Sequence, residues 1–304
     1  MITETRKASK KRAVSTSVCA FADSFPFARR LAAELGARLR PLKQHRFPDG
    51  EALVRAEPHP ERNALVVRTL DHPDPKLFET MLAADALRRG GARRVTLVAP
   101  YLPYMRQDTV FEPGEPVSQR VLGAMLALVF DRVVTVEAHL HRVRTLREAI
   151  PCRAISLSAA PVLARWMKSR APDALVVGPD HESTPWVRKI GRAAGLKWIV
   201  GRKERRGDRS VRVHFDDVPS AGRAFVIDDI ASSGATLAAA ARALRQRGVK
   251  EVDAIVVHAL FAPGSMALIR RAGVRRVISC DTIANPTNAI GCAPLVARAL
   301  EGIA

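Results

Sequence analysis

Short apolar runs and longer helical stripes alternate along most of the chain. The runs at 63–69 and 94–99 have the length of buried strands. Between them, 76–89 places apolar side chains three and four residues apart, which predicts a helix that ends at Gly90 and Gly91. A strand, a helix and a second strand in this order are typical of a parallel sheet covered by helices.

The same unit recurs in both halves of the chain. A helix end, a glycine, a short loop and an apolar strand follow one another from Leu87, from Leu244 and from Ile269. Right-handed crossovers between such strands give parallel sheets with helices on both faces. We therefore predict an α/β fold of two similar domains, each a mainly parallel sheet flanked by helices. The predicted divisions are a basic disordered tail at 1–16, an N-terminal domain at 17–155 and a C-terminal domain at 156–304.

The stretch 223–248 has the order of a phosphate-binding site. An apolar strand at 224–227 is followed by two carboxylates, then by a loop of small residues and an Ala- and Leu-rich helix. Small residues let backbone N–H groups approach an anion, and the start of a helix adds unpaired donors. The candidate site residues are Asp228, Asp229, Ser232, Ser233, Gly234, Ala235 and Thr236.

An ordinary strand-to-helix turn with a serine cap would explain the loop alone. Two adjacent carboxylates at the end of an apolar strand need partners or solvent, which favours a phosphosugar site. These carboxylates would lie at the carboxyl end of the strand, where open α/β sheets bind ligands. They could accept hydrogen bonds from sugar hydroxyl groups or hold Mg²⁺ through water.

The net charge of the chain limits the kinds of ligand that it is expected to bind. Lys and Arg total 49 against 30 Asp and Glu, a formal net charge of +19. Such a chain suits a polyanion, and ATP, a sugar phosphate and nucleic acid all qualify. Aromatic residues make up only 5%, without a basic–aromatic stacking pattern, which argues against nucleic acid. Much of the excess is Arg scattered through predicted helices, as on a solvated surface.

No apolar run approaches the ~20 residues that span a bilayer, and the longest, 121–130, predicts a buried helix. The four cysteines are scattered without a C-x-x-C pair. This argues for a reducing compartment and against a disulfide framework or a zinc site. We therefore expect a cytoplasmic protein without a membrane segment.

Several polar segments follow or connect the predicted strands. The long loop that starts at Pro100 presents Arg106, Gln107 and Asp108 together, and His139 follows a predicted strand. By themselves these are an ordinary polar loop tip and a lone histidine. The segment 201–209 carries dense charge between glycines, which predicts an exposed mobile loop.

The long loop resembles a segment of the ribose-phosphate diphosphokinases, also called PRPP synthetases. Their pattern P-Y-x-x-Y-x-R-Q-D-x-x-F-x-x-G-E-P-x-S is matched by Pro100, Tyr101, Tyr104, Arg106, Gln107, Asp108, Phe111, Gly114, Glu115, Pro116 and Ser118. The loop at 228–236 is also similar to that of type I phosphoribosyltransferases, which lack this segment. The resemblance extends over about 18–303.

The resemblance implies a role for each motif. ATP would be bound by Arg106, Gln107 and Asp108, and by Phe47, Asp49 and Glu51 of a neighbouring subunit. The metal would be held by His139 and Asp180. Lys203 and Arg205 would be the catalytic cations on a loop that closes over ATP. Ribose 5-phosphate would be bound by Asp228, Asp229 and the loop residues Ser232, Ser233, Gly234, Ala235 and Thr236.

The resemblance also implies the fold and the activity. Two phosphoribosyltransferase-like domains would place the ATP side in the N-terminal domain and the ribose 5-phosphate loop in the C-terminal one. The reaction would be magnesium-dependent transfer of the diphosphoryl group of ATP to the 1-hydroxyl of ribose 5-phosphate, giving phosphoribosyl pyrophosphate and AMP. Members of the family form dimers that assemble further, often to hexamers.

Three departures from the family pattern leave alternatives open. Ala235 adds a methyl group where we expect a positive φ, and Glu182 and Ser183 replace a glycine pair. Glu137 replaces the commoner aspartate before the histidine. One alternative is a divergent paralogue that acts on another phosphosugar. The other is a non-catalytic regulatory partner of a true synthetase, against which the retained Lys203 argues.

Overall fold

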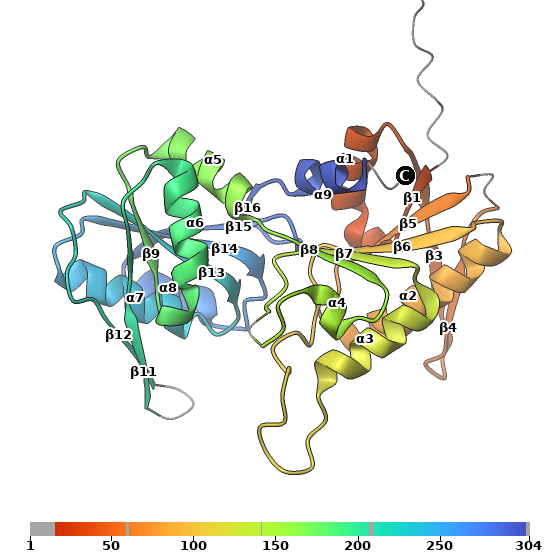
Figure 1. Ribbon diagram of the computed structural model, residues 1–304, viewed down its shortest axis with the longest axis horizontal. Coiled ribbons are helices and arrows are strands. Elements are labelled where there is room, and N and C mark those ends of the chain that lie inside the picture. Colours follow the sequence, from red (N-terminus) through yellow and green to blue (C-terminus); the bar gives the residue numbers. More distant parts are fainter. Residues whose placement is uncertain (1–15, 59–60, 141, 207–209, 302–304) are drawn as a thin grey trace, which may run out of the picture.

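The chain folds around two six-stranded parallel sheets that lie side by side (Figure 1). The structure is a computed structural model that describes residues 16–58, 61–140, 142–206 and 210–301. The predicted tail at 1–16 lies outside the described residues, apart from Thr16, which begins the first strand. The predicted α/β class with two similar domains is confirmed.

The first sheet has the strand order β2-β1-β5-β6-β7-β8. Its strands are β1 (Thr16–Ala20), β2 (Arg38–Pro41), β5 (Asn63–Val67), β6 (Arg94–Ala99), β7 (Arg132–Val136) and β8 (Arg153–Leu157). Its helices are α1 (Phe25–Leu35), α2 (Pro73–Arg89), α3 (Ser118–Val129) and the short α4 (Leu146–Ala149), and a 3₁₀ turn covers Ala22–Ser24. A separate hairpin, β3 (Lys43–Arg46) and β4 (Ala52–Arg55), extends from this domain.

The second sheet has the strand order β10-β9-β13-β14-β15-β16. Its strands are β9 (Leu175–Gly178), β10 (Trp198–Val200), β13 (Arg223–Ala231), β14 (Glu251–Ala259), β15 (Val274–Cys280) and β16 (Asn288–Ile290). Its helices are α5 (Ala160–Arg170), α6 (Thr184–Ala194), α7 (Ala235–Gln246), α8 (Ser265–Arg271) and α9 (Ala293–Leu300), with a 3₁₀ turn at His181–Ser183. A second hairpin consists of β11 (Arg202–Arg206) and β12 (Ser210–His214).

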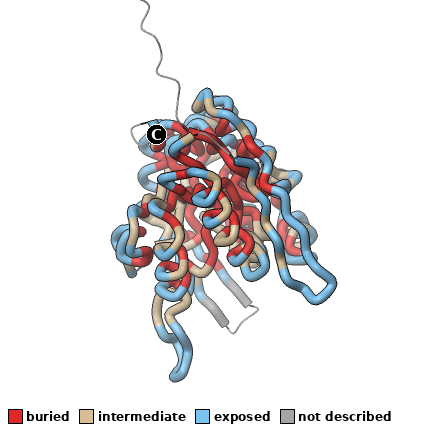
Figure 2. The backbone as a smooth tube through the Cα atoms, turned by 90° about the vertical axis from the view of Figure 1, so that its right-hand side faces the viewer, coloured by how far each residue is buried: buried red, intermediate tan, exposed pale blue. Residues whose placement is uncertain are grey.

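One apolar core contains residues of both sheets, and Figure 2 shows buried segments in the interior of the molecule. It joins Val18 and Val134 of the first sheet to Val176 and Ile255 of the second. The last helix, α9, packs on α1 of the first domain (Figure 1). The division predicted at 155/156 stays a prediction; β8 crosses that position as part of the first sheet.

Two predicted elements differ from the structure. The segment predicted as a mobile loop at 201–209 begins as β11, which pairs with β12. β11 itself is entirely charged, and the β-branched residues Val211 and Val213 belong to its partner, so the pairing could not be read from 201–209 alone. The helix predicted to be buried at 121–130 is α3, in which Val121 is 54% exposed and Leu128 80% exposed. An apolar run does not reveal which face has a neighbour.

The close packing of α3 on α4 gives a test of the fold. A methyl group at Gly123 would lie 1.8 Å from the carbonyl oxygen of Ala149, so one backbone segment would have to move. We expect Gly123→Ala to lower the free energy of unfolding by about 1–3 kcal/mol, although alanine normally stabilises a helix. Urea denaturation measures this change. The exposed neighbour Ala124 provides the control, since Ala124→Ser should stay within about 0.5 kcal/mol of the parent; an unchanged or more stable Gly123→Ala would refute this packing.

Candidate active site

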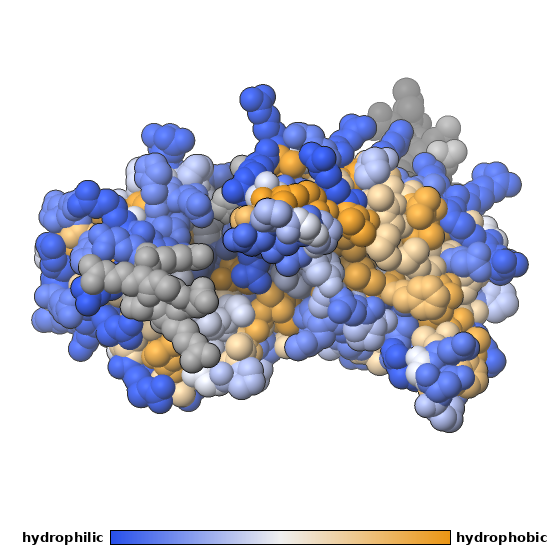
Figure 3. Space-filling view, turned by 90° about the horizontal axis from the view of Figure 1, so that it is seen from below, coloured by the Kyte–Doolittle hydropathy of each residue, from blue (hydrophilic) through white to orange (hydrophobic). Residues whose placement is uncertain are grey.

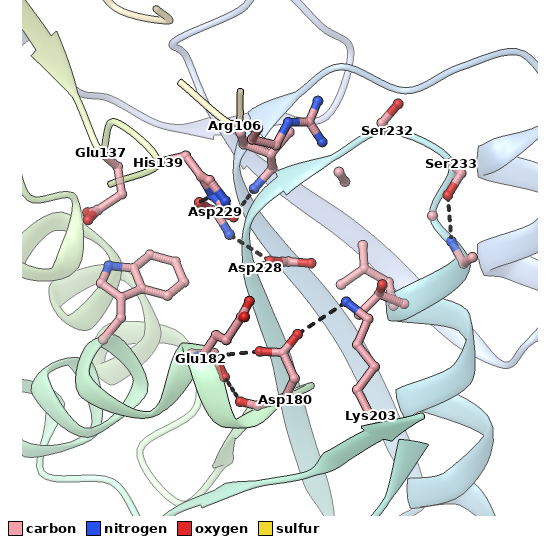
Figure 4. Close-up of a pocket in the computed structure, with 18 of the residues that line it drawn as sticks. Arg106, Glu137, His139, Asp180, Glu182, Lys203, Asp228, Asp229, Ser232 and Ser233 are labelled. Atoms are coloured by element: carbon pink, nitrogen blue, oxygen red, sulfur yellow. Dashed lines mark hydrogen bonds and ion pairs between the residues drawn. The ribbon is translucent and has the colours of Figure 1, made fainter. Parts of the chain in front are cut away.

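A cavity of about 380 Å³ lies between the two domains at the carboxyl ends of β7, β9 and β13 (Figure 4). Parallel strands of open α/β sheets bind ligands at this edge. Eleven of the predicted site residues line it, namely Arg106, His139, Asp180, Lys203, Asp228, Asp229, Ser232, Ser233, Gly234, Ala235 and Thr236. The fold therefore brings these residues together from both halves of the chain.

The acidic pair lies within a strand and not after its end. β13 was predicted to stop at Ile227, but it continues to Ala231 because β14 pairs with it that far, while β9 pairs only up to Val226. The side chain of Asp228 is desolvated and close to the charges of Asp229 and Asp180. Burial, followed by these two negative charges, raises the pKa of Asp228 well above its usual range.

Asp229 is held by a histidine from the other domain. Its carboxylate oxygen Oδ2 lies 2.5 Å from Nδ1 of His139, and its Oδ1 accepts the backbone N–H of Ile230 at 2.8 Å. Burial alone would raise the pKa of Asp229, but the hydrogen bond and charge of His139 outweigh it and lower that pKa to about 2. The histidine and the carboxylate thus form a hydrogen bond across the domain boundary.

Lys203 enters the cavity from the hairpin (Figure 4). Its Nζ donates to Oδ2 of Asp180 at 3.2 Å. The hairpin is anchored at its start, where the backbone N–H of Gly201 donates to the carbonyl of Gly178 at 2.9 Å. Asp180 is held in turn as the cap of the following 3₁₀ turn, where it accepts the N–H of Ser183 at 3.2 Å.

The small-residue loop ends at the start of α7. Gly234 has φ +73°, and a Cβ there would lie 2.7 Å from a side-chain carbon of Ile269, so both conformation and space require glycine. The positive φ expected at Ala235 was wrong, because Ala235 is the first helical residue and its conformation is unstrained. The helix start directs unpaired backbone N–H groups towards the cavity, where they can bind an anion.

Glu137 is the main residue that sequence reasoning did not assign to the site. It lines the cavity with φ +41°, a conformation that non-glycine residues rarely adopt. Its carboxylate accepts the backbone N–H of Ala159 at 2.5 Å and the hydroxyl of Ser158 at 3.2 Å. Burial raises the pKa of Glu137, and the bond from Ala159 partly offsets this. Strain at a cavity is typical of functional positions.

Glu182, Ser183 and Trp186 also line the cavity. The sequence signal for the first two is their departure from the glycine pair of the family pattern. Nothing in the sequence around Trp186 indicated that it would reach the site.

The remaining predicted residues lie away from this cavity. Phe47, Asp49 and Glu51 form the exposed turn between β3 and β4, where the backbone N–H of Phe47 donates to the carbonyl of Glu51 at 2.8 Å. Asp108 accepts a hydrogen bond from Arg142 at 2.6 Å, and Gln107 lies beside a separate small cavity. Arg205 belongs to β11, with its backbone opposite Val211.

The donor chemistry of the cavity fits Mg²⁺. The carboxylates of Asp180, Asp228 and Asp229 crowd one another enough to raise the pKa of Asp228. Within the described residues no group of three acidic, His or Cys side chains forms a complete metal cage. Mg²⁺ does not need one, because it is usually held by one or two carboxylates together with substrate phosphates and water.

The fold and the cavity define a transferase built on two phosphoribosyltransferase-like domains. Residues 16–129 match the family model of the N-terminal domain of ribose phosphate pyrophosphokinase, and residues 161–295 match the phosphoribosyl transferase domain. The ribose-phosphate pyrophosphokinase of Methanopyrus kandleri is 34% identical over 94% of this chain and 99% of its own. That of Thermococcus kodakarensis is 32% identical over 85% and 91%.

A solved structure agrees with these relatives. The crystal structure of phosphoribosylpyrophosphate synthetase from Mycobacterium smegmatis matches with a TM-score of 0.81 and 25% identity, over 95% of this chain and 98% of that one. The chain belongs to the ribose-phosphate pyrophosphokinase family. The family predicted from the motifs is therefore confirmed.

The two adjacent carboxylates should respond oppositely to loss of charge. The pKa of Asp228 is raised on folding, so its negative charge costs stability above its unfolded pKa of about 3.8. The pKa of Asp229 is lowered to about 2, so its charge stabilises the fold above pH 3.8 and this gain is lost as the pH falls towards 2. At pH 7, Asp228→Asn should raise the free energy of unfolding and Asp229→Asn should lower it by roughly 2 kcal/mol.

Urea denaturation of both variants at pH 7 and at pH 3 tests this. Both differences from the parent should shrink at pH 3, where the carboxylates begin to take up protons. Since the two residues are neighbours and the substitutions are the same, each variant is the matched control for the other. A shift of both variants in the same direction would contradict the opposite environments.

Proposed function

We propose that this enzyme transfers the diphosphoryl group of ATP to the 1-hydroxyl of ribose 5-phosphate, giving phosphoribosyl pyrophosphate and AMP. The observation that carries the proposal is the convergence of Lys203, the acidic pair and the small-residue loop on one cavity. Its relatives named ribose-phosphate pyrophosphokinase support the same reaction. In this proposal His139 and Asp180 serve the metal.

Ribose 5-phosphate would bind along β13 and the start of α7. The loop residues Ser232 to Thr236 and the first N–H groups of α7 would hold the 5-phosphate, because donors converge on an anion there. Asp228 and Asp229 would accept hydrogen bonds from ribose hydroxyl groups. This binding would place the 1-hydroxyl in the cavity, facing the hairpin that carries Lys203.

ATP would enter from the side of the N-terminal domain. Arg106 lines the cavity and would contact the phosphates, and Gln107 and Asp108 would contribute from the same loop. The oxygen of the 1-hydroxyl would attack the β-phosphorus, and the bond from that phosphorus to the oxygen of AMP would break. The proton of the hydroxyl would be released.

The positive charges of the hairpin would act in the transition state. Negative charge builds up on the oxygens of the transferred group and on the departing AMP, and Lys203 and Arg205 would stabilise it. Lys203 is already oriented by Asp180, so little reorganisation is required. Bound Mg²⁺ would neutralise phosphate charge and help to align the reacting groups. No covalent enzyme intermediate is needed.

A specific observation favours a second candidate. Glu182 and Ser183 line the cavity at positions where the family has small residues, so the sugar side of the site differs. A different phosphosugar acceptor would follow from that difference. A regulatory partner without catalysis is disfavoured by the oriented Lys203.

The protein would act as a homo-oligomer, either a dimer or a larger assembly of dimers up to a hexamer. Among the described residues, large apolar side chains are exposed on the β3–β4 hairpin, α2 and α3, at Phe47, Leu53, Phe78, Val121 and Leu128. Figure 3 shows apolar surface between the charged groups of this domain. Exposed apolar surface of this kind marks interaction sites.

The expected setting is the cytoplasm, without a membrane partner and with nucleic acid disfavoured. The described cysteines are free thiols, as in a reducing compartment. In the described part of the chain no helix has the length and apolar character to cross a membrane.

The reaction is tested by AMP release from ATP with and without ribose 5-phosphate, and with phosphoribosyl pyrophosphate measured as the second product. We expect release to require ribose 5-phosphate, and Lys203→Ala to lower kcat by about 10²–10³-fold, because it removes an oriented cation. Lys197→Ala removes an exposed lysine outside the cavity and should keep normal activity. Thermal melts should confirm that both variants are folded.

A near-normal kcat in Lys203→Ala would contradict the catalytic role. Release of AMP with another phosphosugar but not with ribose 5-phosphate would favour the second candidate.

Mixing two inactive variants tests whether each ATP site is shared between two subunits. If Asp49 reaches the ATP of a neighbouring subunit, a subunit carrying Asp49→Ala and one carrying Lys203→Ala together contain one complete site. Statistical mixing of a dimer then restores roughly a quarter of the parental activity, provided that the subunits exchange. Mixtures of each variant with itself are the controls. A monomeric protein with full activity would rule out the shared site.

A further inference from the structure

A second cavity, of about 320 Å³, lies at the opposite, amino edge of the first sheet. The first residues of β1, β5, β6, β7 and β8 line it, namely Thr16, Asn63, Arg94, Arg132 and Arg153. Leu300 at the end of α9 also borders the cavity, and α9 packs on β7 and β8 (Figure 1). The strands are five to six residues long, so about 16–20 Å separates this cavity from the catalytic edge.

The strand register places three arginines on one face. Arg132 is directly opposite Arg153 on β8, and on its other side it is opposite Thr96 of β6. Arg94 comes two residues before Thr96 and therefore points to the same face. Neighbouring strands lie about 4.8 Å apart, so Arg132 and Arg153 are a like-charge pair in direct register. Such pairs destabilise a sheet unless an anion lies between them.

Among the described residues, Asp131 is the source of negative side-chain charge at this cluster. Asp131 is the acidic residue that lines the cavity, and its carboxylate already accepts from Arg88 at 2.9 Å and from the N–H of Val95 at 2.8 Å. Arg94 donates to Asn63, whose amide is neutral, at 3.1 Å. The C-terminal end of α9 adds only about half a negative charge.

Arg132 carries the clearest sign of a missing partner. Its Nε is buried and has no hydrogen-bond partner among the described residues. Burial, followed by the positive charges of Arg153 and Arg94, lowers the pKa of Arg132. A buried guanidinium donor without an acceptor costs free energy that an anion in the cavity would recover.

We propose that this cavity binds a small phosphate anion with two or more negative charges, such as inorganic diphosphate or a phosphate monoester. Guanidinium groups match phosphate oxygens in pairs, and three of them converge here. Thr16, Asn63 and Thr96 add neutral polar groups. The volume is that of a small-molecule site, and the concave shape does not suit a duplex or a membrane surface. The site is independent of the proposed reaction.

The experiment compares the thermal midpoint of the full chain with those of Arg153→Gln and Arg93→Gln, each with increasing inorganic diphosphate. Chloride at matched ionic strength controls for screening. Arg153 is exposed at the cavity, and Arg93 is an exposed neighbour of Arg94 that does not line it. Diphosphate can also bind at the catalytic edge, but that contribution is common to all three proteins, so differences between them isolate the amino-edge cavity.

Without diphosphate, Arg153→Gln should melt at or above the parent, because it removes one of two opposed like charges. With diphosphate, the parent and Arg93→Gln should gain about 2–4 °C more than Arg153→Gln. Equilibrium binding should find one site more per chain in the parent than in Arg153→Gln. Parallel midpoint shifts in all three proteins, or equal numbers of sites, would overturn the proposal.

Discussion

The crowding of three carboxylates at one edge of the second sheet is the constraint on which the rest of the site depends. Asp228 and Asp229 belong to β13 and Asp180 follows the neighbouring strand β9, and the charges of Asp229 and Asp180 act strongly on Asp228 because its carboxyl group is buried. The fold offsets this repulsion with positive charge from elsewhere. His139 arrives from the other domain, and Lys203 arrives from the β11–β12 hairpin.

The contact between His139 and Asp229 requires the two domains to be closely packed. The hydrogen bond between His139 and Asp229 would be broken by a small rotation between the sheets, leaving the carboxylate of Asp229 without this partner. A continuous apolar core holds the sheets against such a rotation. Glu137 adds polar contacts at the same boundary, and its strained conformation is maintained because Ser158 and Ala159 hold its carboxylate. Packing and charge therefore support the same arrangement.

The sequence predicted features that depend on local pattern and missed those that depend on neighbours. The strand at 94–99 was predicted with its observed bounds and the helix at 76–89 with its observed end, because periodicity and terminating glycines are local signals. The length of β13 depends on pairing with β14, 20 or more residues away in the chain, and was therefore underestimated. The β11–β12 hairpin that carries Lys203 and the exposed face of α3 were also not predicted, because both depend on which parts of the chain lie beside them.

The site residues also differ in whether they could be predicted from local pattern or depend on distant parts of the chain. Asp228, Asp229 and the loop before α7 could be predicted because the acidic pair and the small residues are adjacent in the chain. Trp186 could not, since nothing but the packing of α6 against the cavity brings it there. The strain expected at Ala235 was misplaced by one residue, because the chain turns at Gly234 and Ala235 is already helical.

The first sheet separates charge along its strands. Register forces Arg132 and Arg153 together at the amino edge, while β7 leads at its other end towards Glu137 and the acidic crevice. Part of the net charge of +19 is therefore concentrated where the strands begin and is not spread over helices alone. Because the two edges have opposite local charge, the proposed ligands would differ: cations with their bound phosphates at the carboxyl edge, and bare anions at the amino edge. The first sheet thus borders two chemically distinct cavities, one at its carboxyl edge that it shares with the second sheet and one at its amino edge.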